Sequence, residues 1–540
     1  MLGHASFKFD LIFKGQLDLD CKSFLKMIEY LTFSNFLSAV FAVIFAAIMY
    51  KLVYEPLVLL HFYKKQGIPM TYRFGIGYFA TNLLDVKRKG DFYYSWKEFG
   101  RRRPVAPAFG GNLANLAHVT LVDPAIIKAF YINHDKYYTK NQMWSSVWKK
   151  VFEHGLLLTE GKEWKRHRRL ISGAFHHEFL KDMVPDVVQI CDRMLEDLKT
   201  KSLENVNIMH EFQAITGELI GRLFFGEEFS KYKLRGIPVA HFLADLIARM
   251  SAENFSLSVL MFGSRFLDLG LTKTHRGILN DTKLFRDFST EVIERKFAEV
   301  SLDPKTAKET RKNIIDVLLA QRAENPSDQL TNDEILEEFV TFFSAGMDTT
   351  GHTITLATYY LHQNPQYRER LNQEVKENFT DISTVTMETL YKCDLATAFM
   401  KEVLRFQHPA GAIFDRIAGE DHKLGNLKIK KGTSVNIGYV SNNFNPDYHD
   451  NVDTFDPDRW LTASKTKEST SKDPYVYIPF SAGSRNCIGQ HFAMIQARVI
   501  FCLFLKKYDF FLRPDYKLAM TLRFLYEPVE DIKYKLTPLQ

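Results

Sequence analysis

The chain contains 540 residues, of which 46% are hydrophobic, 14% aromatic and 25% charged. This length exceeds the roughly 100–200 residues of an average domain. The composition is that of a globular protein, which excludes a disordered chain, a collagen and a small disulfide-stapled scaffold. A net charge of +6 is too small over this length to indicate nucleic-acid binding, so we expect no nucleic-acid partner.

The N-terminal region predicts one membrane-spanning helix. Residues 31–50 contain no charged side chain, and about 20 residues at 1.5 Å each span the core of a bilayer. A signal peptide and a buried core helix are the alternatives. The run starts late, lacks a basic segment before it and has no small-residue cleavage site after it, which disfavours the signal peptide. We expect an N-terminal extension over 1–30, a transmembrane anchor over 31–50 and a linker over 51–70.

The flanking charges predict the orientation of this anchor. Positive residues dominate the segment after it, where Glu55 is opposed by Lys51, Lys64, Lys65 and Arg73. Positive flanks stay in the cytoplasm, so we expect a single-pass protein in contact with membrane lipid and with residues 71–540 in the cytosol.

The remainder of the chain has mainly helical periodicity. Helical patterns dominate residues 140–406, and shorter alternating runs with turn signals occupy residues 411–440. Residues 71–540 contain no internal repeat and no linker long enough to divide them. The sequence therefore predicts a single domain that is mainly α with a minor β region.

A cysteine near the C-terminus stands in a glycine-rich loop before a helix. The five cysteines are widely scattered and no pair has zinc-ligand or redox spacing, so a cysteine with a chemical role must act alone. Residues 480–489 read Phe-Ser-Ala-Gly-Ser-Arg-Asn-Cys-Ile-Gly, and a helical pattern follows. This places Cys487 at a helix N-terminus, where free amides and the helix dipole favour a thiolate that can ligate a metal. A small buried cysteine is the alternative.

This segment resembles the haem-binding signature of the cytochrome P450 family. The fixed positions of that signature are all present, namely Phe480, Gly483, Arg485, Cys487 and Gly489. The resemblance implies the P450 fold, a helix-rich haem domain with small sheets, over about residues 65–540. It also implies haem b (iron protoporphyrin IX) with Cys487 as the thiolate ligand of its iron, Phe480 against the ligand loop and Arg485 at a propionate.

A long helix carries a second motif. Thr331 and Glu334 form a capping box, and the helical pattern then continues to Gln363, before Asn364-Pro365. Its middle reads Ala345-Gly346-Met347-Asp348-Thr349-Thr350. The residues on one face, with two small side chains beside a hydroxyl, leave room for a planar ring and a diatomic ligand: Phe342, Ala345, Gly346, Thr349 and Thr353.

The glycine and the polar residues of this motif can also be explained by helix structure alone, without a functional role. Gly346 permits a local bulge in the helix. Without the cysteine loop, Thr349 is equally explained by a hydrogen bond to the preceding turn, and Asp348 by an exposed helix face. The resemblance assigns Thr349 as the alcohol that hydrogen-bonds dioxygen and Asp348 as the acid of the proton relay. Many fatty-acid hydroxylases of the family have glutamate where this chain has Ala345, so we expect no ester bond to haem.

The resemblance also implies structural or cofactor-binding roles for residues outside these two motifs. Glu402 and Arg405 lie three residues apart on a predicted helix over 395–406, and with Arg459 they would form a buried network that fixes the cysteine loop. Without the resemblance, the pair is an ordinary surface pair. Trp164 and Arg168, on a basic helix, would approach a haem propionate, and Arg416 is a further candidate. The other cations of that helix would dock an acidic electron donor.

The resemblance to the cytochrome P450 family implies a monooxygenase that inserts one atom of O2 into a lipophilic substrate such as a fatty acid, sterol or xenobiotic. The chain contains no segment resembling a flavin or nicotinamide domain, so electrons would come from NADPH through a separate NADPH-cytochrome P450 reductase. The anchor then indicates the endoplasmic reticulum membrane. The alternatives are an oxygen-independent haem-thiolate isomerase or dehydratase, which usually lacks the acid–alcohol pair, and a non-enzymatic haem carrier or sensor.

Overall fold

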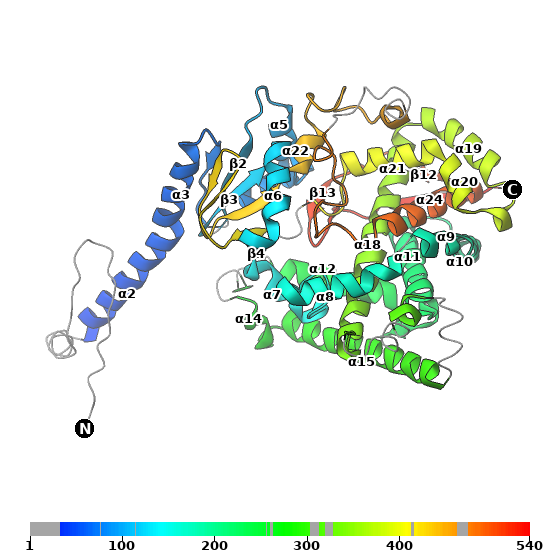
Figure 1. Cartoon of the computed structure of the whole chain (residues 1–540), viewed down its shortest axis with the longest axis horizontal. Coiled ribbons are helices and arrows are strands. Elements are labelled where there is room, and N and C mark those ends of the chain that lie inside the picture. The colour runs from blue at the N-terminus through cyan, green and yellow to red at the C-terminus, as the bar shows by residue number, and fades with distance from the viewer. Residues whose placement is uncertain are drawn as a thin grey trace.

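The protein is represented by a computed structural model (Figure 1). It describes residues 33–539 except 76, 114, 176, 255, 257, 260–262, 303–312, 319–327, 412–414 and 462–472. The N-terminal extension predicted over residues 1–30 lies outside the described residues.

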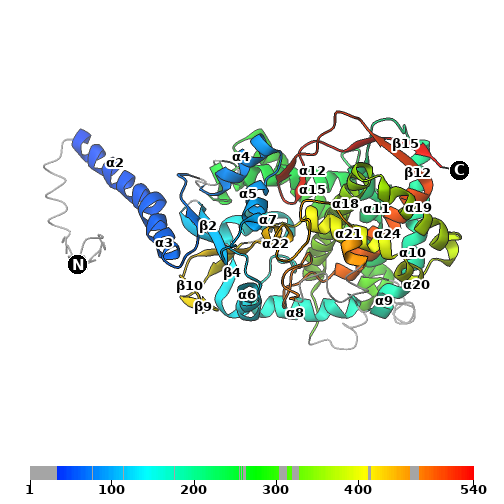
Figure 2. The same ribbon diagram turned by 90° about the horizontal axis from the view of Figure 1, so that it is seen from above.

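The apolar N-terminal helix projects away from the rest of the molecule (Figures 1 and 2). It consists of α2 (Phe33–Met49), a π-helical turn (Tyr50–Tyr54) and α3 (Glu55–Lys64). Pro56 lies in the first turn of α3 and has no N–H to donate, which accounts for the change of helix type before it. The segment Phe36–Lys64, which contains an 18-residue stretch with a mean hydropathy of 2.3, is the one helix among the described residues long and apolar enough to cross a membrane.

The segment predicted as a linker over residues 51–70 is helical as far as Lys64. Its last turns are fixed to the body, because Leu60 and Tyr63 are buried and the Tyr63 hydroxyl lies 2.7 Å from Thr433 Oγ1. The helix therefore continues beyond residue 50 and ends against the six-stranded sheet of the body.

A six-stranded sheet lies next to this helix, in the order β1-β2-β3-β11-β8-β4. Its strands are β1 (Met70–Thr71), β2 (Ala108–Leu113), β3 (Leu116–Leu121), β4 (Tyr138–Lys140), β8 (Arg416–Ala418) and β11 (Ser434–Ile437). β11 runs parallel to β3 and antiparallel to β8, which brings the β-type segment predicted over 411–440 beside the N-terminal hairpin. The helices near the sheet are α4 (Phe79–Lys89), α5 (Tyr94–Arg101), α6 (Pro124–Tyr137) and α22 (Tyr439–Asn443) (Figure 2).

Helices make up most of the remaining molecule, as predicted. In chain order they are α7 (Gln142–Phe152), α8 (Gly161–Ser172), α9 (His177–Asp182), α10 (Val184–Asp197), α11 (Ile208–Phe225), α12 (Val239–Asn254), α14 (Arg265–Asp268), α15 (Lys273–Leu302), α18 (Asn332–Gln363), α19 (Gln366–Asn378), α20 (Met387–Lys392), α21 (Asp394–Phe406) and α24 (Gln490–Lys507). Small two- and three-stranded sheets complete the fold: β5 (Val206–Asn207), β6 (Lys233–Leu234), β7 (Ile237–Pro238), β9 (His422–Leu424), β10 (Leu427–Ile429), β12 (Tyr508–Leu512), β13 (Met520–Leu522), β14 (Tyr526–Pro528) and β15 (Lys533–Pro538).

The long helix α18 passes through the centre of the helical body (Figure 1). Its predicted capping box is confirmed: Glu334 N donates to Thr331 Oγ1 at 3.2 Å and Thr331 N donates to Glu334 Oε2 at 2.8 Å. Packing against α11 fixes the middle of α18, where Thr216 Oγ1 donates to the Met347 carbonyl at 2.8 Å. These contacts hold the central motif of α18 opposite the start of α24.

Candidate active site

A cavity of about 410 Å³ lies between α18 and the cysteine loop that precedes α24. Its volume falls in the range typical of small-molecule and cofactor sites. The loop supplies one wall through Phe480, Arg485, Cys487 and Gly489, and α18 supplies the facing wall. The remaining lining comes from α6, α8, α11, α21 and the strands β4, β8 and β11, among other segments. The cavity thus brings together the two motifs found in the sequence.

The cysteine loop is held in shape by its backbone. Cys487 N donates to the Phe480 carbonyl at 2.9 Å, which closes the loop. Gly483 has a φ of +69°, a conformation that side chains other than glycine rarely adopt, and an added Cβ would approach Tyr131 Cβ to 3.2 Å. Gly489 is the N-cap of α24. The loop therefore presents the Cys487 thiol to the cavity at the start of a helix.

The ionisation of Cys487 differs from the sequence-based expectation. Its side chain is accessible from the cavity but otherwise closely surrounded by protein. This burial raises the pKa of the Cys487 thiol, and the Gly489 amide and the Arg168 charge oppose the rise without reversing it. The helix N-terminus alone is thus insufficient to favour the thiolate. A bound metal cation would supply the missing stabilisation, since metal ligation requires the deprotonated sulfur.

The cavity is strongly basic. Lys140, Arg168, Arg416 and Arg485 line it, and the described residues of its lining include neither aspartate nor glutamate. Burial, followed by the neighbouring charges of Arg416 and Arg485, lowers the pKa of Lys140 well below its ordinary value. A site with several cations and no carboxylate of its own is complementary to an anionic ligand. The residues present therefore fit a flat cofactor that carries carboxylates and a thiolate-bound metal.

All four residues predicted near a propionate line this cavity. The Arg485 guanidinium stacks 3.7 Å from the centre of the Trp164 ring and donates to the Thr159 carbonyl at 2.9 Å. Arg168 donates to the carbonyl and side-chain oxygens of Asn486 at 2.8 and 2.7 Å, so it also holds the cysteine loop. Arg416 Nε donates to His134 Nε2 at 2.7 Å.

Several lining residues had no sequence signal. Lys140 is an isolated lysine at the end of β4, and its Nζ donates to the Thr159 carbonyl at 2.9 Å. His408 also lines the cavity, and burial lowers its pKa to about 4, so it is neutral near pH 7. Lys140 reaches the site through the pairing of β4 with β8, and His408 through the fold of the segment after α21, and no local pattern encodes either placement.

The facing wall is the predicted face of α18. Phe342, Ala345, Gly346, Thr349 and Thr353 all line the cavity, which confirms that they share one side of the helix. α18 is a continuous α-helix here, so the bulge that Gly346 was expected to permit is not formed. Thr349 Oγ1 donates to the Ala345 carbonyl at 2.8 Å, the ordinary bond of a threonine within a helix, and Thr353 repeats this bond one turn later.

Asp348 points away from this cavity and toward α11. It is buried, with 5% of its surface exposed, so the exposed-face alternative is wrong. Gln213 Nε2 donates to Asp348 Oδ1 at 2.7 Å, and His352 Nδ1 lies 3.2 Å from the same oxygen. His352 Nε2 lies 3.2 Å from Glu527 Oε2. Burial alone would lower the pKa of His352, but the interactions with Asp348 and Glu527 outweigh it and raise the pKa to about 10.

Glu402, Arg405 and Arg459 form the predicted buried network. Glu402 accepts from Arg405 Nη2 at 2.8 Å, from Arg405 Nε at 3.0 Å and from Arg459 Nε at 3.2 Å. The glutamate and Arg405 are fully buried, which excludes the surface-pair alternative. The network joins α21 to residues 443–460, and the hydroxyl of Tyr477, three residues before Phe480, donates to the Lys401 carbonyl at 2.9 Å. Its link to the cysteine loop is therefore indirect.

Comparisons with known proteins agree with this site. The sequence model described as Cytochrome P450 matches residues 77–535. A cytokinin hydroxylase of Arabidopsis thaliana is 28% identical over 457 residues, covering 84% of each chain, and human cytochrome P450 4F8 is 29% identical over 432 residues, covering 77% of this chain and 78% of the other. A crystal structure of the cytochrome P450DA haem domain matches with a TM-score of 0.71 at 19% identity, covering 87% of this chain and 97% of that one.

The chain belongs to the cytochrome P450 family. It is accordingly a haem-dependent monooxygenase, an oxidoreductase that uses O2, a lipophilic substrate and a redox partner.

Proposed function

We propose that this protein inserts one atom of O2 into a lipophilic substrate, of the fatty acid, sterol or xenobiotic type, with electrons that a separate NADPH-cytochrome P450 reductase delivers. The observation that carries the proposal is the placement of the Cys487 thiol and the hydroxyl-bearing face of α18 on opposite walls of one basic cavity. The apolar helix α2–α3 supports a single-pass anchor in the endoplasmic reticulum membrane, with the catalytic domain in the cytosol.

The cofactor in this proposal is haem b, held by residues of this chain on two sides. Cys487 would ligate the iron as a thiolate, with Phe480, Gly483 and Gly489 shaping the loop around it. Arg485, Arg168, Trp164 and Arg416 would receive the propionates, whose carboxylates would pair with the arginine charges in a lining that supplies no carboxylate itself. When bound, the haem supplies the redox-active iron that activates O2. Ala345 and Gly346 would leave space for the ring and the oxygen molecule.

Thr349 and Asp348 would supply protons in this reaction. Thr349 Oγ1 is the hydroxyl on the α18 wall, and it can turn from the Ala345 carbonyl toward the cavity at the cost of one hydrogen bond. Asp348 is the adjacent carboxylate, held by Gln213 and His352. A rotation about its side-chain torsions would carry a proton from this buried cluster to the cavity side of the helix.

The redox partner would approach the exposed side of α8. Lys162 and Lys165 are exposed there. Arg166 and Arg169 are engaged with Glu334 and Asp328, so they contribute less to docking.

Two measurements test the proposed function. The reduced protein with carbon monoxide should give the red-shifted absorption of a thiolate-ligated haem. Purified full-length protein with NADPH and the reductase should then convert a lipophilic substrate to a product that contains one oxygen atom from ¹⁸O2. Product without O2 consumption would instead identify an isomerase or dehydratase, and haem binding without any turnover of a broad lipophilic panel would identify a carrier or sensor.

A further inference from the structure

His167 and Glu338 form a buried contact that the reaction proposed above does not use. His167 lies on α8 and is 0% exposed, and Glu338 lies on α18 with 2% of its surface exposed. The two side chains face each other, with His167 Nδ1 2.7 Å from Glu338 Oε1. His167 Nε2 lies 3.2 Å from Glu334 Oε1, about one turn earlier on α18. Both nitrogens of the histidine therefore face carboxylates of the same helix.

The ionisation of this pair maintains its hydrogen bond. Burial alone would lower the pKa of His167, but the interactions with Glu338 and then Glu334 outweigh it and raise the pKa. Burial raises the pKa of Glu338, and the contacts with His167 and the Leu156 amide oppose the rise without reversing it. Because both pKa values are raised, the pair retains the proton that its hydrogen bond requires near neutral pH.

The second oxygen of Glu338 holds the chain segment that precedes α8. Glu338 Oε2 accepts from the Leu156 backbone N at 3.1 Å. Gly155, the preceding residue, packs so closely on α18 that an added Cβ would collide with Thr341 Oγ1. One carboxylate of α18 therefore fixes two parts of the chain, α8 through its histidine and the segment before α8 through a backbone amide.

These two parts of the chain carry residues expected at the haem propionates. α8 carries Trp164 and Arg168, which line the cavity of about 410 Å³ between α18 and the cysteine loop. The segment before α8 carries the Thr159 carbonyl, which accepts from Arg485 at 2.9 Å and from Lys140 at 2.9 Å. The basic edge of this large cavity is thus attached to α18, the helix of the facing wall.

The connection continues from α8 to the cysteine loop. Arg168 directly follows His167, and it donates to the carbonyl and side-chain oxygens of Asn486 at 2.8 and 2.7 Å. Asn486 in turn precedes Cys487. A displacement of α8 would therefore move both the arginine that faces a propionate and the loop that presents the thiol.

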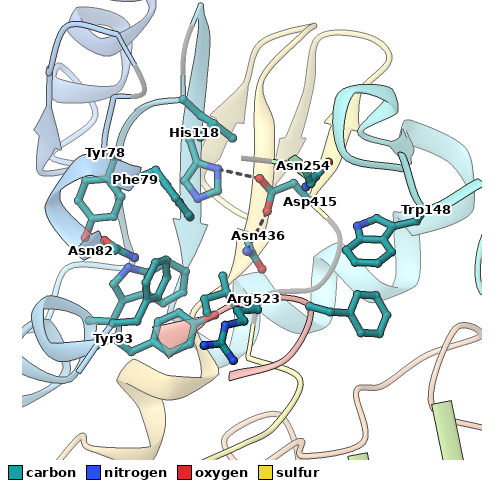
Figure 3. A pocket seen from close by; sticks show the side chains of 15 residues that line it. Tyr78, Phe79, Asn82, Tyr93, His118, Trp148, Asn254, Asp415, Asn436 and Arg523 are labelled. Carbon is teal, nitrogen blue, oxygen red and sulfur yellow. Dashed lines mark hydrogen bonds and ion pairs between the residues drawn. The ribbon is translucent and has the colours of Figure 1, made fainter. Parts of the chain in front are cut away.

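Other buried histidines contact carboxylates without joining the two walls of the large cavity. His118 lies 3.4 Å from Asp415 beside a separate cavity of about 80 Å³ (Figure 3). That contact stays within the six-stranded sheet, because His118 lies on β3 and Asp415 directly precedes β8. His275 lies 3.4 Å from Glu253 and joins α15 to α12, which contribute none of the described residues that line the large cavity. The position of His167, and not its burial, distinguishes it from these histidines.

We propose that His167 and Glu338 are positioning residues for the haem propionates. Their contact holds α8 and the segment before it at the distance from α18 at which Trp164, Arg168 and Arg485 reach the carboxylates of the cofactor. Neither His167 nor Glu338 lines the cavity, so both act through the side chains that they place. The inference rests on the proposed function, because it concerns the cofactor of that same reaction.

The test compares the wild-type full-length holoprotein with His167→Gln, Glu338→Gln and the double variant. The rate of haem transfer to excess apomyoglobin measures how firmly the cofactor is held. The resonance Raman band of propionate bending reports the hydrogen bonds of the propionates, and the reduced carbon monoxide spectrum shows whether Cys487 still ligates the iron. His275→Gln is the matched control, because it removes a buried histidine that contacts a carboxylate away from the large cavity.

His167→Gln should release haem about tenfold faster than the wild type or more, the equivalent of one lost hydrogen bond to a charged group. Its propionate band should shift while the red-shifted carbon monoxide absorption is retained. Glu338→Gln should have at least as large an effect, because only one of its two terminal atoms can accept a hydrogen bond. The double variant should release haem no faster than Glu338→Gln, since both substitutions break the same contact. His275→Gln should lower only the unfolding midpoint.

The outcomes separate this proposal from the proposed function. Unchanged haem release and an unchanged propionate band in His167→Gln overturn the positioning role, and so do equal changes in His275→Gln or additive effects in the double variant. If His167→Gln does not fold, Glu338→Gln is judged by the same two measurements. If the reductase system oxidises a lipophilic substrate while the variants hold haem as the wild type does, only the positioning role fails. If the variants behave as expected but no lipophilic substrate is oxidised, the positioning role stands and the proposed function fails.

Discussion

Replacement of Glu402 tests whether the buried network holds the domain together. Glu402 accepts five hydrogen bonds: two from Arg405, one from Arg459, one from the Trp460 ring nitrogen and one from the Asp456 backbone. In Glu402→Gln the charge is lost and an NH2 group replaces one carboxylate oxygen. Each oxygen accepts at least two of these bonds, so at least two donors then face another donor.

The expected loss follows from these contacts. A hydrogen bond to a charged group contributes about 1.5–3 kcal/mol, so two lost bonds amount to about 3–6 kcal/mol. This agrees with the roughly 3–5 kcal/mol for removing one partner of a buried ion pair. Such a loss is a large part of the roughly 5–15 kcal/mol that stabilises a typical protein. We therefore expect Glu402→Gln to unfold at a markedly lower urea concentration and to be purified with little haem.

The assay is urea unfolding followed by circular dichroism, together with the ratio of haem to protein absorbance. Glu98→Gln is the matched control, because Glu98 and Arg101 also lie three residues apart but are 43% and 27% exposed at the surface. Exposed pairs contribute about 0–1 kcal/mol. Equal unfolding midpoints and equal haem content for the two variants would refute the reasoning.

Three further predictions concern the cavity and its surroundings. Thr349→Ala should retain haem but lower the product formed per NADPH severalfold and release peroxide. Thr355→Ala is the control and should not have this effect, because it removes a buried hydroxyl bonded only within the helix and to Met209. An equal amount of product per NADPH in both variants would contradict the role of Thr349. His352 has its pKa raised from an ordinary 6.5 to about 10, so its charge stabilises the folded state fully below pH 6.5, and this contribution is lost as the pH rises toward 10. The difference in unfolding free energy between the wild type and His352→Gln should therefore be largest near pH 6 and shrink at alkaline pH, and a pH-independent difference would argue against the charged pair with Asp348 and Glu527. Cys487→Ser should abolish the red-shifted carbon monoxide absorption, and its persistence would remove Cys487 as the iron ligand.

Local sequence rules were sufficient for several features of the site. The turn glycines and the helix start around Cys487 lie within ten residues, so their geometry depends on neighbours in the chain. The capping box at Thr331 and the α18 face from Phe342 to Thr353 follow in the same way from helical periodicity. These features could be predicted because the residues whose interactions define them lie only a few positions apart in the sequence.

The environment of Asp348 could not be predicted in this way. Its partner Gln213 lies 135 residues away, and Glu527, which binds His352, lies 175 residues from that histidine. The helical pattern shows only that Asp348 is adjacent to Thr349, and the direction of the carboxylate depends on packing between α18, α11 and β14. The same holds for Lys140, which strand pairing brings to the cavity.

The thiol of Cys487 shows why an isolated rule can mislead. The position at a helix N-terminus favours an anion, as the sequence suggested, but burial raises the pKa of the Cys487 thiol more strongly than the Gly489 amide and the Arg168 charge lower it. The balance between these effects depends on how closely residues from other elements surround the sulfur. The motif around Cys487 in the sequence carries no information about how closely those residues surround the sulfur.

The junction between α3 and the sheet has a consequence for the whole molecule. Every residue from Phe33 to Lys64 is helical. The end of this helix is fixed against the six-stranded sheet by the buried side chains of Leu60 and Tyr63 and by the hydrogen bond between Tyr63 and Thr433. In the proposed membrane-anchored state, a bilayer around α2 would therefore also set the tilt of the haem domain relative to the lipid. In that state, a substitution at Thr433, which contacts Tyr63, would change this tilt and thereby the face of the domain that is turned toward the lipid.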